Sequence, residues 1–344
     1  MGLKYWFLII TCVWCAAAVA REEGVNSAVL LSLLTTIEEK YVLTDHTSQI
    51  KQALLDYQNS EAFYAIKTPN DLASQLTREL NTFDKHFTVQ FVSDTNQSAP
   101  QQESWFKRLN RNNSGFNKVE VLEGNIGYID FWGFASLTEA SKATVSSALT
   151  FLSNTDALIL DLRNNGGGSA EMVQYLSSHF FAKKTHLNSF YTRQTDSTSE
   201  FWTFENVETV FPAPFSVYIL ISNNTFSAAE EFAYNFKHLG RATLVGQPSK
   251  GGANPWQWFD IEHGYRAGIP VAMAINPITE TNWEGVGVIP HVSVNSENAL
   301  NKAYFMALQN IRNNVNNEFQ RNEIKRKLAE LMKEESSLFP TFSL

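Results

Sequence analysis

The sequence predicts an α/β protein whose mixed core follows a helical region, and two patterns carry that prediction. Residues 25–92 hold three successive stretches with apolar residues at helical spacing, which is typical of a small helical bundle. From Lys118 onward, short apolar segments rich in β-branched residues alternate with amphipathic helical segments. Alternation of this kind favours a sheet with helices on both faces.

Length and composition limit the class of protein. The chain has 344 residues, more than the roughly 100–200 of a usual domain, so two structural units are expected. Hydrophobic residues make up 44% and aromatic residues 13%, which is enough for a packed core. There are 35 Asp and Glu against 27 Lys and Arg, without a basic stripe, so nucleic acid is a poor candidate partner. A peptide or an apolar small molecule suits this balance better.

Residues 1–20 have the layout of a secretory signal peptide. An apolar run over residues 5–14 follows a basic residue and ends in Ala18, Val19 and Ala20. We therefore expect export to a periplasm or secretion; a retained membrane anchor is the alternative, although a bilayer span needs about 20 apolar residues. Both cysteines lie inside this segment, so a mature chain would have no disulfide, thiolate metal site or cysteine nucleophile.

The remaining chain divides by pattern. Residues 21–93 are expected to form an N-terminal helical domain, with Asn70 or Asp71 capping its last helix. Residues 94–117, polar and without periodicity, are a predicted linker. Residues 118–296 are the predicted α/β core and 297–344 a helical tail. The core holds predicted helices at 137–154 and 169–181, a hairpin-like stretch at 186–204, and strands at 119–134, 156–163, 217–222, 241–247, 256–261 and 266–276.

The segment from Val217 to Phe236 carries the first functional signal. An apolar strand ends in the polar turn Asn223, Asn224 and Thr225, and helical spacing begins at Phe226. Ser227 is thereby placed at the amino end of a helix, where unpaired N–H groups and positive dipole charge gather.

Ser227 has two interpretations at this point. It can be a nucleophile, but Ser227 followed by Glu230 also fits the capping box, in which serine and glutamate satisfy free backbone donors. These residues alone leave both interpretations open.

A glycine-rich loop follows the strand that ends near Asp161. Gly166, Gly167 and Gly168 allow a tight turn that presents backbone N–H groups, as acyl transfer requires at its oxyanion. The loop lacks the Lys-Ser/Thr and the G-x-G-x-x-G spacing of nucleotide sites, which argues against a bound phosphate.

A general base is the other requirement of a serine nucleophile. Among seven histidines, His86 lies in Asp84-Lys85-His86, where the helical domain ends and a cleft could form. No group of residues has the spacing of metal ligands, and this chemistry needs neither a metal nor a cofactor.

Three segments together resemble the carboxy-terminal processing, or tail-specific, serine peptidases. They are the serine block N-x-T-x-S-A-A-E at 223–230, the block D-L-R-N-N-G-G-G at 161–168, and the run 240–255 with 276–294. The last run most resembles the branch with the tricorn-type proteases and the interphotoreceptor retinoid-binding protein modules. The resemblance extends from about Glu38 to Val294.

This resemblance implies a serine peptidase on a crotonase-like β/α spiral core of the ClpP/crotonase type, with a helical N-terminal domain. Ser227 matches the nucleophile. The N–H groups of Ala228 and Gly167 match the oxyanion donors. A peptide or protein substrate is implied as well.

The resemblance leaves two candidate bases. The tail-specific branch uses a lysine 25 positions after the serine, where this chain has Gly252, and Lys250 lies two residues short of it. The tricorn-like branch uses a histidine, which His86 resembles, although Lys85 replaces the serine that precedes it there.

A carboxylate beside the imidazole would fix its tautomer and stabilise its charged form. Glu284 resembles the acidic member of the tricorn-like set, and Asp84 is the competing candidate for orienting His86. The predicted linker has 24 residues, too few for the PDZ domain of many tail-specific peptidases, so substrate selection would fall to the cleft.

A second function of another class remains open, namely a binding protein for a retinoid-like or fatty-acid-like ligand on the same fold. Five aromatic residues support it, although such residues are more often part of a core. They are Phe131, Trp132, Trp256, Trp258 and Trp283. A non-catalytic scaffold is the third alternative.

Overall fold

The computed structural model describes residues 24–92 and 103–338, which divide into two compact units. Unit one comprises residues 24–92, 191–197 and 254–273; unit two comprises 103–190, 198–253 and 274–338. The expected signal peptide and part of the expected linker lie outside the described residues. No helix within the described ranges is long and apolar enough to cross a bilayer. The α/β class with an N-terminal helical region is confirmed.

Unit one combines helices with a small antiparallel sheet of order β1–β10–β9. Its elements are a helix over 24–40, η1 (Thr44–His46), α2 (Thr47–Gln58), α3 (Glu61–Tyr64), α4 (Pro69–Leu80), β1 (Thr88–Phe91), β9 (Trp256–Ile261), η5 (Glu262–Gly264) and β10 (Tyr265–Pro270).

One hydrophobic cluster joins these helices to the sheet, with Leu33 and Leu76 fully buried on the helical side and Ile269 on β10. The segment 254–273 thus clusters with the N-terminal helices. The helix α4 begins with Thr68, whose Oγ1 accepts from the N–H of Asp71 at 3.1 Å, so the predicted cap at Asn70 or Asp71 is wrong. Pro69 takes the first helical position, where its missing N–H costs nothing.

Unit two is built on a six-stranded sheet of order β12–β8–β7–β4–β3–β2. The strands are β2 (Phe116–Leu122), β3 (Ile126–Phe131), β4 (Ala157–Asp161), β7 (Ser216–Ile221), β8 (Thr243–Gly246) and β12 (Val292–Ser293). The β2–β3 pair is antiparallel and the other pairs are parallel. Every residue of β4 is buried, as expected for a strand covered on both faces.

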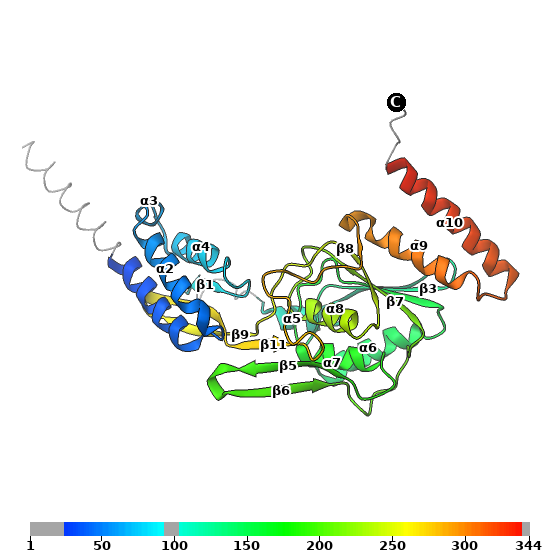
Figure 1. Cartoon of the computed structure of the whole chain (residues 1–344), viewed down its shortest axis with the longest axis horizontal. Helices are drawn as coiled ribbons and strands as arrows, with labels where there is room; N and C mark the ends of the chain where they lie inside the picture. The colour runs from blue at the N-terminus through cyan, green and yellow to red at the C-terminus, as the bar shows by residue number, and fades with distance from the viewer. Residues whose placement is uncertain (1–23, 93–102, 339–344) are drawn as a thin grey trace, which may run out of the picture. The chain divides into compact units, whose positions relative to one another are not determined.

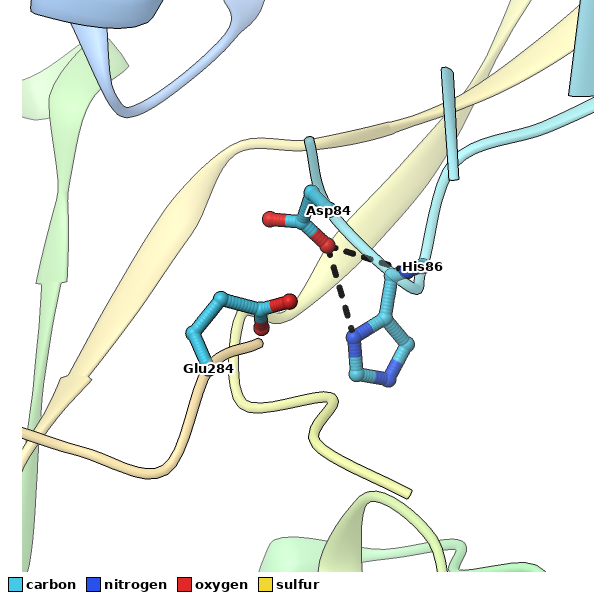
Figure 2. A group of neighbouring side chains, drawn as sticks. All are labelled: Asp84, His86 and Glu284. Carbon is cyan, nitrogen blue, oxygen red and sulfur yellow. Dashed lines mark hydrogen bonds and ion pairs between the residues drawn. The ribbon is translucent and has the colours of Figure 1, made fainter. Parts of the chain in front are cut away.

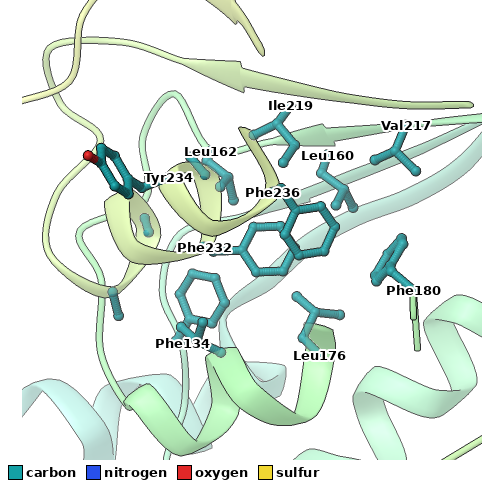
Figure 3. Packing of buried hydrophobic residues seen from close by; sticks show 14 of the residues in the cluster. Phe134, Leu160, Leu162, Leu176, Phe180, Val217, Ile219, Phe232, Tyr234 and Phe236 are labelled. Atoms are coloured by element: carbon teal, nitrogen blue, oxygen red, sulfur yellow. The ribbon is translucent and has the colours of Figure 1, made fainter. Parts of the chain in front are cut away.

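Alternate residues of the central strands lie on opposite faces of the sheet and belong to two separate hydrophobic cores. Leu160 and Ile219 belong to the cluster beneath α6 (Glu139–Phe151), α7 (Ala170–Ser178) and α8 (Ala228–His238). Figure 3 shows them with the aromatic rings of α8. Ile159 and Leu220 belong to a second cluster, which includes buried residues of α9 (Ala299–Ile311). Figure 1 shows the ribbon of α9 on the other side of the sheet from α6 and α7. Phe232 and Phe236 stack with ring centroids 4.1 Å apart and fill the first core.

The other elements complete the chain. They are α5 (Trp105–Arg111), η3 (Asn113–Gly115), a three-stranded sheet of order β11–β5–β6 formed by β5 (His186–Thr192), β6 (Ser197–Trp202) and β11 (Ala272–Ile275), then η4 (Arg193–Thr195), η6 (Ser296–Asn298) and α10 (Glu318–Leu338).

The strands β4, β7 and β8 run parallel, so their carboxyl ends meet at one edge of the sheet. The segments that follow them, 162–169, 222–227 and 247–253, therefore emerge together. Ligands of open α/β sheets bind at this edge.

Candidate active site

Ser227 lies in the sharp turn between β7 and α8. Its backbone has φ 55° and ψ −123°, a combination that a residue with a Cβ rarely adopts. The side chain is half-buried, and Ala228 begins the helix directly after it. As a first helical residue, Ala228 has no partner for its N–H within the helix.

Hydrogen bonds to the neighbouring loop hold this turn. The Thr225 hydroxyl donates to the Leu162 carbonyl at 2.7 Å and accepts from the N–H of Ser222 at 2.9 Å. The N–H of Phe226 donates to the Asn165 carbonyl at 3.0 Å. The turn is thus fixed to the glycine-rich loop after β4.

The glycine-rich loop passes directly against the serine. A Cβ built on Gly167 would lie 2.7 Å from the Phe226 carbonyl oxygen, 2.8 Å from Ser227 Cβ and 2.9 Å from the nitrogen of Ala228. Gly167 has φ +89°, so both its conformation and its surroundings require glycine. Its N–H donates to Asn165 Oδ1 at 2.9 Å, which means that this group already has a partner in the structure.

Glu230, on the first turn of α8, is fully buried and accepts four hydrogen bonds. Oε2 accepts from the N–H groups of Ser227 at 2.8 Å and Gly252 at 2.9 Å. Oε1 accepts from the Ser249 hydroxyl at 2.5 Å and the N–H of Gly251 at 2.6 Å. Burial raises the pKa of Glu230 to about 7, while these four hydrogen bonds act in the opposite direction.

Glu284 is attached to the same loop. Its Oε2 accepts from the N–H of Ala253 at 2.6 Å, and its own N–H donates to Asn282 Oδ1 at 2.9 Å. Trp283 adds a hydrogen bond from Nε1 to the Gly252 carbonyl at 2.9 Å. The loop 249–253 therefore connects Glu284 to Glu230 within unit two.

His86 and Asp84 lie in unit one, in the turn between α4 and β1, and both are buried. Asp84 Oδ1 accepts from the backbone N–H of His86 at 2.9 Å and lies 3.9 Å from its Nδ1 (Figure 2). Asp84 Oδ2 accepts from Asn254 Nδ2 at 2.8 Å. The carboxylate is thus fixed facing the Nδ1 side of the imidazole, which is the arrangement of a histidine oriented by an acid.

Lys250 is exposed, and its Nζ lies 4.5 Å from the centroid of the Phe226 ring. The Lys250 side chain is therefore open to solvent, whereas a lysine that acts as a base is usually buried.

The structure thus places Ser227, Ala228 and Gly167 together, with Lys250 and Glu284 in the same unit, and it places Asp84 beside His86 in the other unit. Three contributors were missed by the sequence reasoning, namely Asn165, Ser249 and Asn254. The capping-box spacing of Ser227 and Glu230 was the local signal for the contact between these two residues.

The five aromatic residues that supported the ligand-binding alternative differ in their burial. Phe131 and Trp283 are buried in the core of unit two. Trp256 and Trp258 are 38% and 37% exposed and contact each other edge to face, with ring centroids 5.0 Å apart. Core packing therefore accounts for two of the five.

A serine on a strained strand-to-helix turn, with a glycine loop against it, is typical of hydrolases that form acyl intermediates. A family model described as peptidase family S41 matches residues 125–294. This part of the chain belongs to family S41, and the protein is a serine peptidase that acts on peptide or protein substrates.

Solved structures share the fold at low sequence identity. A candidate peptidase from Parabacteroides merdae has a TM-score of 0.59 and 16% identity, covering 83% of this chain and 97% of its own. A lipoprotein from Streptococcus agalactiae has a TM-score of 0.52 and 17% identity, with coverages of 83% and 96%. The tricorn protease has a TM-score of 0.50 and 12% identity, covering 84% of this chain and 37% of its own.

Proposed function

We propose that this chain hydrolyses peptide bonds through an acyl-enzyme on Ser227, with His86 as the general base. The conformation of Ser227 is the observation that carries the proposal. A residue with a Cβ is held at φ 55° beside a glycine loop and at the start of a helix, and such strain is found mainly at functional sites.

The reaction begins when Ser227 Oγ attacks the carbonyl carbon and gives its proton to His86 Nε2. The N–H of Ala228 stabilises the oxyanion, and Gly167 supplies the second donor by releasing Asn165 Oδ1. The C–N bond then breaks, and His86 returns the proton to the departing amine. Water hydrolyses the ester in the second half of the reaction, with His86 again as the base.

Asp84 is assigned the orienting role because it faces Nδ1 of His86 and is itself held by Asn254. Glu284, which resembles the acidic member of the tricorn-like set, supplies a second carboxylate. Ala253 and Asn254 are consecutive residues, and they donate to Glu284 and Asp84 respectively.

Hydrolysis of a peptide library tests the function, with wild type and Ser227→Ala compared at equal concentration. We expect turnover in the wild type and a loss of about 10³-fold or more in the variant, because only the nucleophile is removed. Equal turnover by both proteins would contradict the proposal. Binding of a retinoid or fatty acid without any peptide turnover would favour the non-catalytic alternative.

We also propose that the chain is exported to a periplasm or secreted, on the pattern of residues 1–20. Fractionation of cells that express a carboxy-terminally tagged chain tests this. Recovery of the full-length chain in the cytosol would contradict it.

A further inference from the structure

A capping glutamate ordinarily hydrogen-bonds only to the end of its own helix, but Glu230 also hydrogen-bonds to a second loop. In a capping box the glutamate needs to accept from the N–H of the capping residue alone. Glu230 does so at Ser227 and then accepts three more hydrogen bonds, all from the loop 249–252. Its carboxylate therefore joins the serine turn to a second loop.

We propose that Glu230 is a positioning residue of the peptidase site. Its carboxylate holds the loop 249–253 in a fixed position relative to Ser227. This role rests on the proposed function. Glu230 acts through Ser227 and the loop and is not required to touch substrate.

The loop it holds carries other parts of the site. The next residue after Gly252 is Ala253, whose N–H binds Glu284. The carbonyl of Gly251 accepts from the N–H of Gly285 at 2.9 Å, and the Ser249 hydroxyl accepts from the N–H of Val288 at 2.6 Å. Loss of the Glu230 carboxylate would therefore release the serine turn and the Glu284 segment together.

The four donors divide evenly between the two oxygens, which makes the amide a sharp probe. Each oxygen of Glu230 accepts two hydrogen bonds, Oε1 from Ser249 and Gly251, Oε2 from Ser227 and Gly252. In Glu230→Gln, the amide NH₂ must face at least one backbone N–H in either orientation, that of Gly251 or those of Ser227 and Gly252. At least one of the four hydrogen bonds is therefore lost although the side-chain volume is kept.

Glu231 offers a matched control on the next position of the same helix. It is 4% exposed, and its burial raises its pKa to about 8, with a contribution from the nearby charge of Glu171. The neighbouring amide of Asn188, which acts against this rise in pKa, lies outside the serine turn and the loop 249–253. Glu231→Gln therefore makes the same chemical change in the same core without touching either loop.

The test measures fluorophosphonate labelling of Ser227, together with kcat and KM for a peptide substrate and thermal melting, in wild type and both variants. We expect Glu230→Gln to lower the labelling rate and kcat by about 100-fold with KM changed less than about threefold, because positioning of a nucleophile acts on the chemical step. Glu231→Gln should label within about threefold of wild type. If Glu230→Gln labels like the control, the role is wrong.

If Glu230→Gln does not fold, Ser249→Ala decides, since it leaves three of the four donors to Glu230, although it also removes the acceptor of the Val288 N–H. A fall of about threefold to tenfold in labelling supports the role, and an unchanged rate overturns it. If the folded wild type takes up no label and cleaves no peptide, the proposed peptidase function itself is wrong.

Discussion

Strain at a single residue is the starting point of the site. Ser227 occupies a backbone region that costs about 1–3 kcal/mol for a residue with a side chain. Hydrogen bonds from Thr225 and to Glu230 keep the turn in place. A chain selected only for stability would have glycine at this position.

Ser227→Gly is therefore expected to be more stable than Ser227→Ala, by about 1 kcal/mol, because glycine adopts positive φ without strain. Both variants lack the hydroxyl and should be equally inactive. Urea unfolding of the two proteins measures the difference, and a less stable glycine variant would show that Ser227 is not strained.

At the scale of an element, the main feature of the glycine-rich loop is its close contact with the start of α8. Gly167 lies against the Ser227 turn and Gly168 against the backbone of Phe134. Neither contact leaves room for a methyl group. The absence of side chains thus allows the loop to lie directly against the Ser227 turn.

Gly167→Ala should lower the free energy of unfolding by more than about 2 kcal/mol and abolish labelling of Ser227, since the methyl group meets the Phe226 carbonyl. Gly240→Ala is the control: Gly240 also has positive φ, at +63°, but nothing lies within 4 Å of the built Cβ. It should cost only about 1 kcal/mol and leave labelling intact. Equal effects of the two changes would contradict this account of the loop.

The strands and helices were easier to predict from the sequence than the contacts between residues far apart in the chain. The continuous apolar runs of β4 and β7 identified both strands, and the sequence placed Ser227 correctly at the amino end of α8. The capping box predicted the hydrogen bond from Ser227 to Glu230, but local spacing carries no information about the loop 249–252. Asn254 contacts Asp84 across 170 residues, which no local pattern encodes.

At the scale of the whole molecule, local sequence patterns likewise do not show which segments pack together in one unit. The patterns of β9 and β10 predicted strands, and the predicted core included them, yet these strands cluster with the N-terminal helices of unit one. A strand's pattern records that one face is buried, not which element buries it.

Two buried glutamates should give the folded protein a distinctive pH dependence. Burial raises the pKa of Glu231 to about 8 from an ordinary value of 4.5. Between these values the folded state holds a proton that the unfolded state has lost, so stability falls as the pH rises through this window. One such group contributes at most about 1.4 kcal/mol per pH unit.

Glu231→Gln should therefore flatten the loss of stability between about pH 4.5 and 8, because the amide does not ionise. Chemical denaturation of wild type and variant across this range measures the effect. Parallel pH profiles for the two proteins would mean that Glu231 does not titrate in this way.

The central claim is a serine nucleophile with a histidine base, and fluorophosphonate labelling tests it most directly. Wild type, Ser227→Ala, His86→Ala and Lys250→Ala are labelled side by side at equal concentration. The account predicts that the label is lost in the Ser227 and His86 variants and kept in Lys250→Ala. Label that persists without His86 and disappears without Lys250, or a wild type that takes up none, would contradict it.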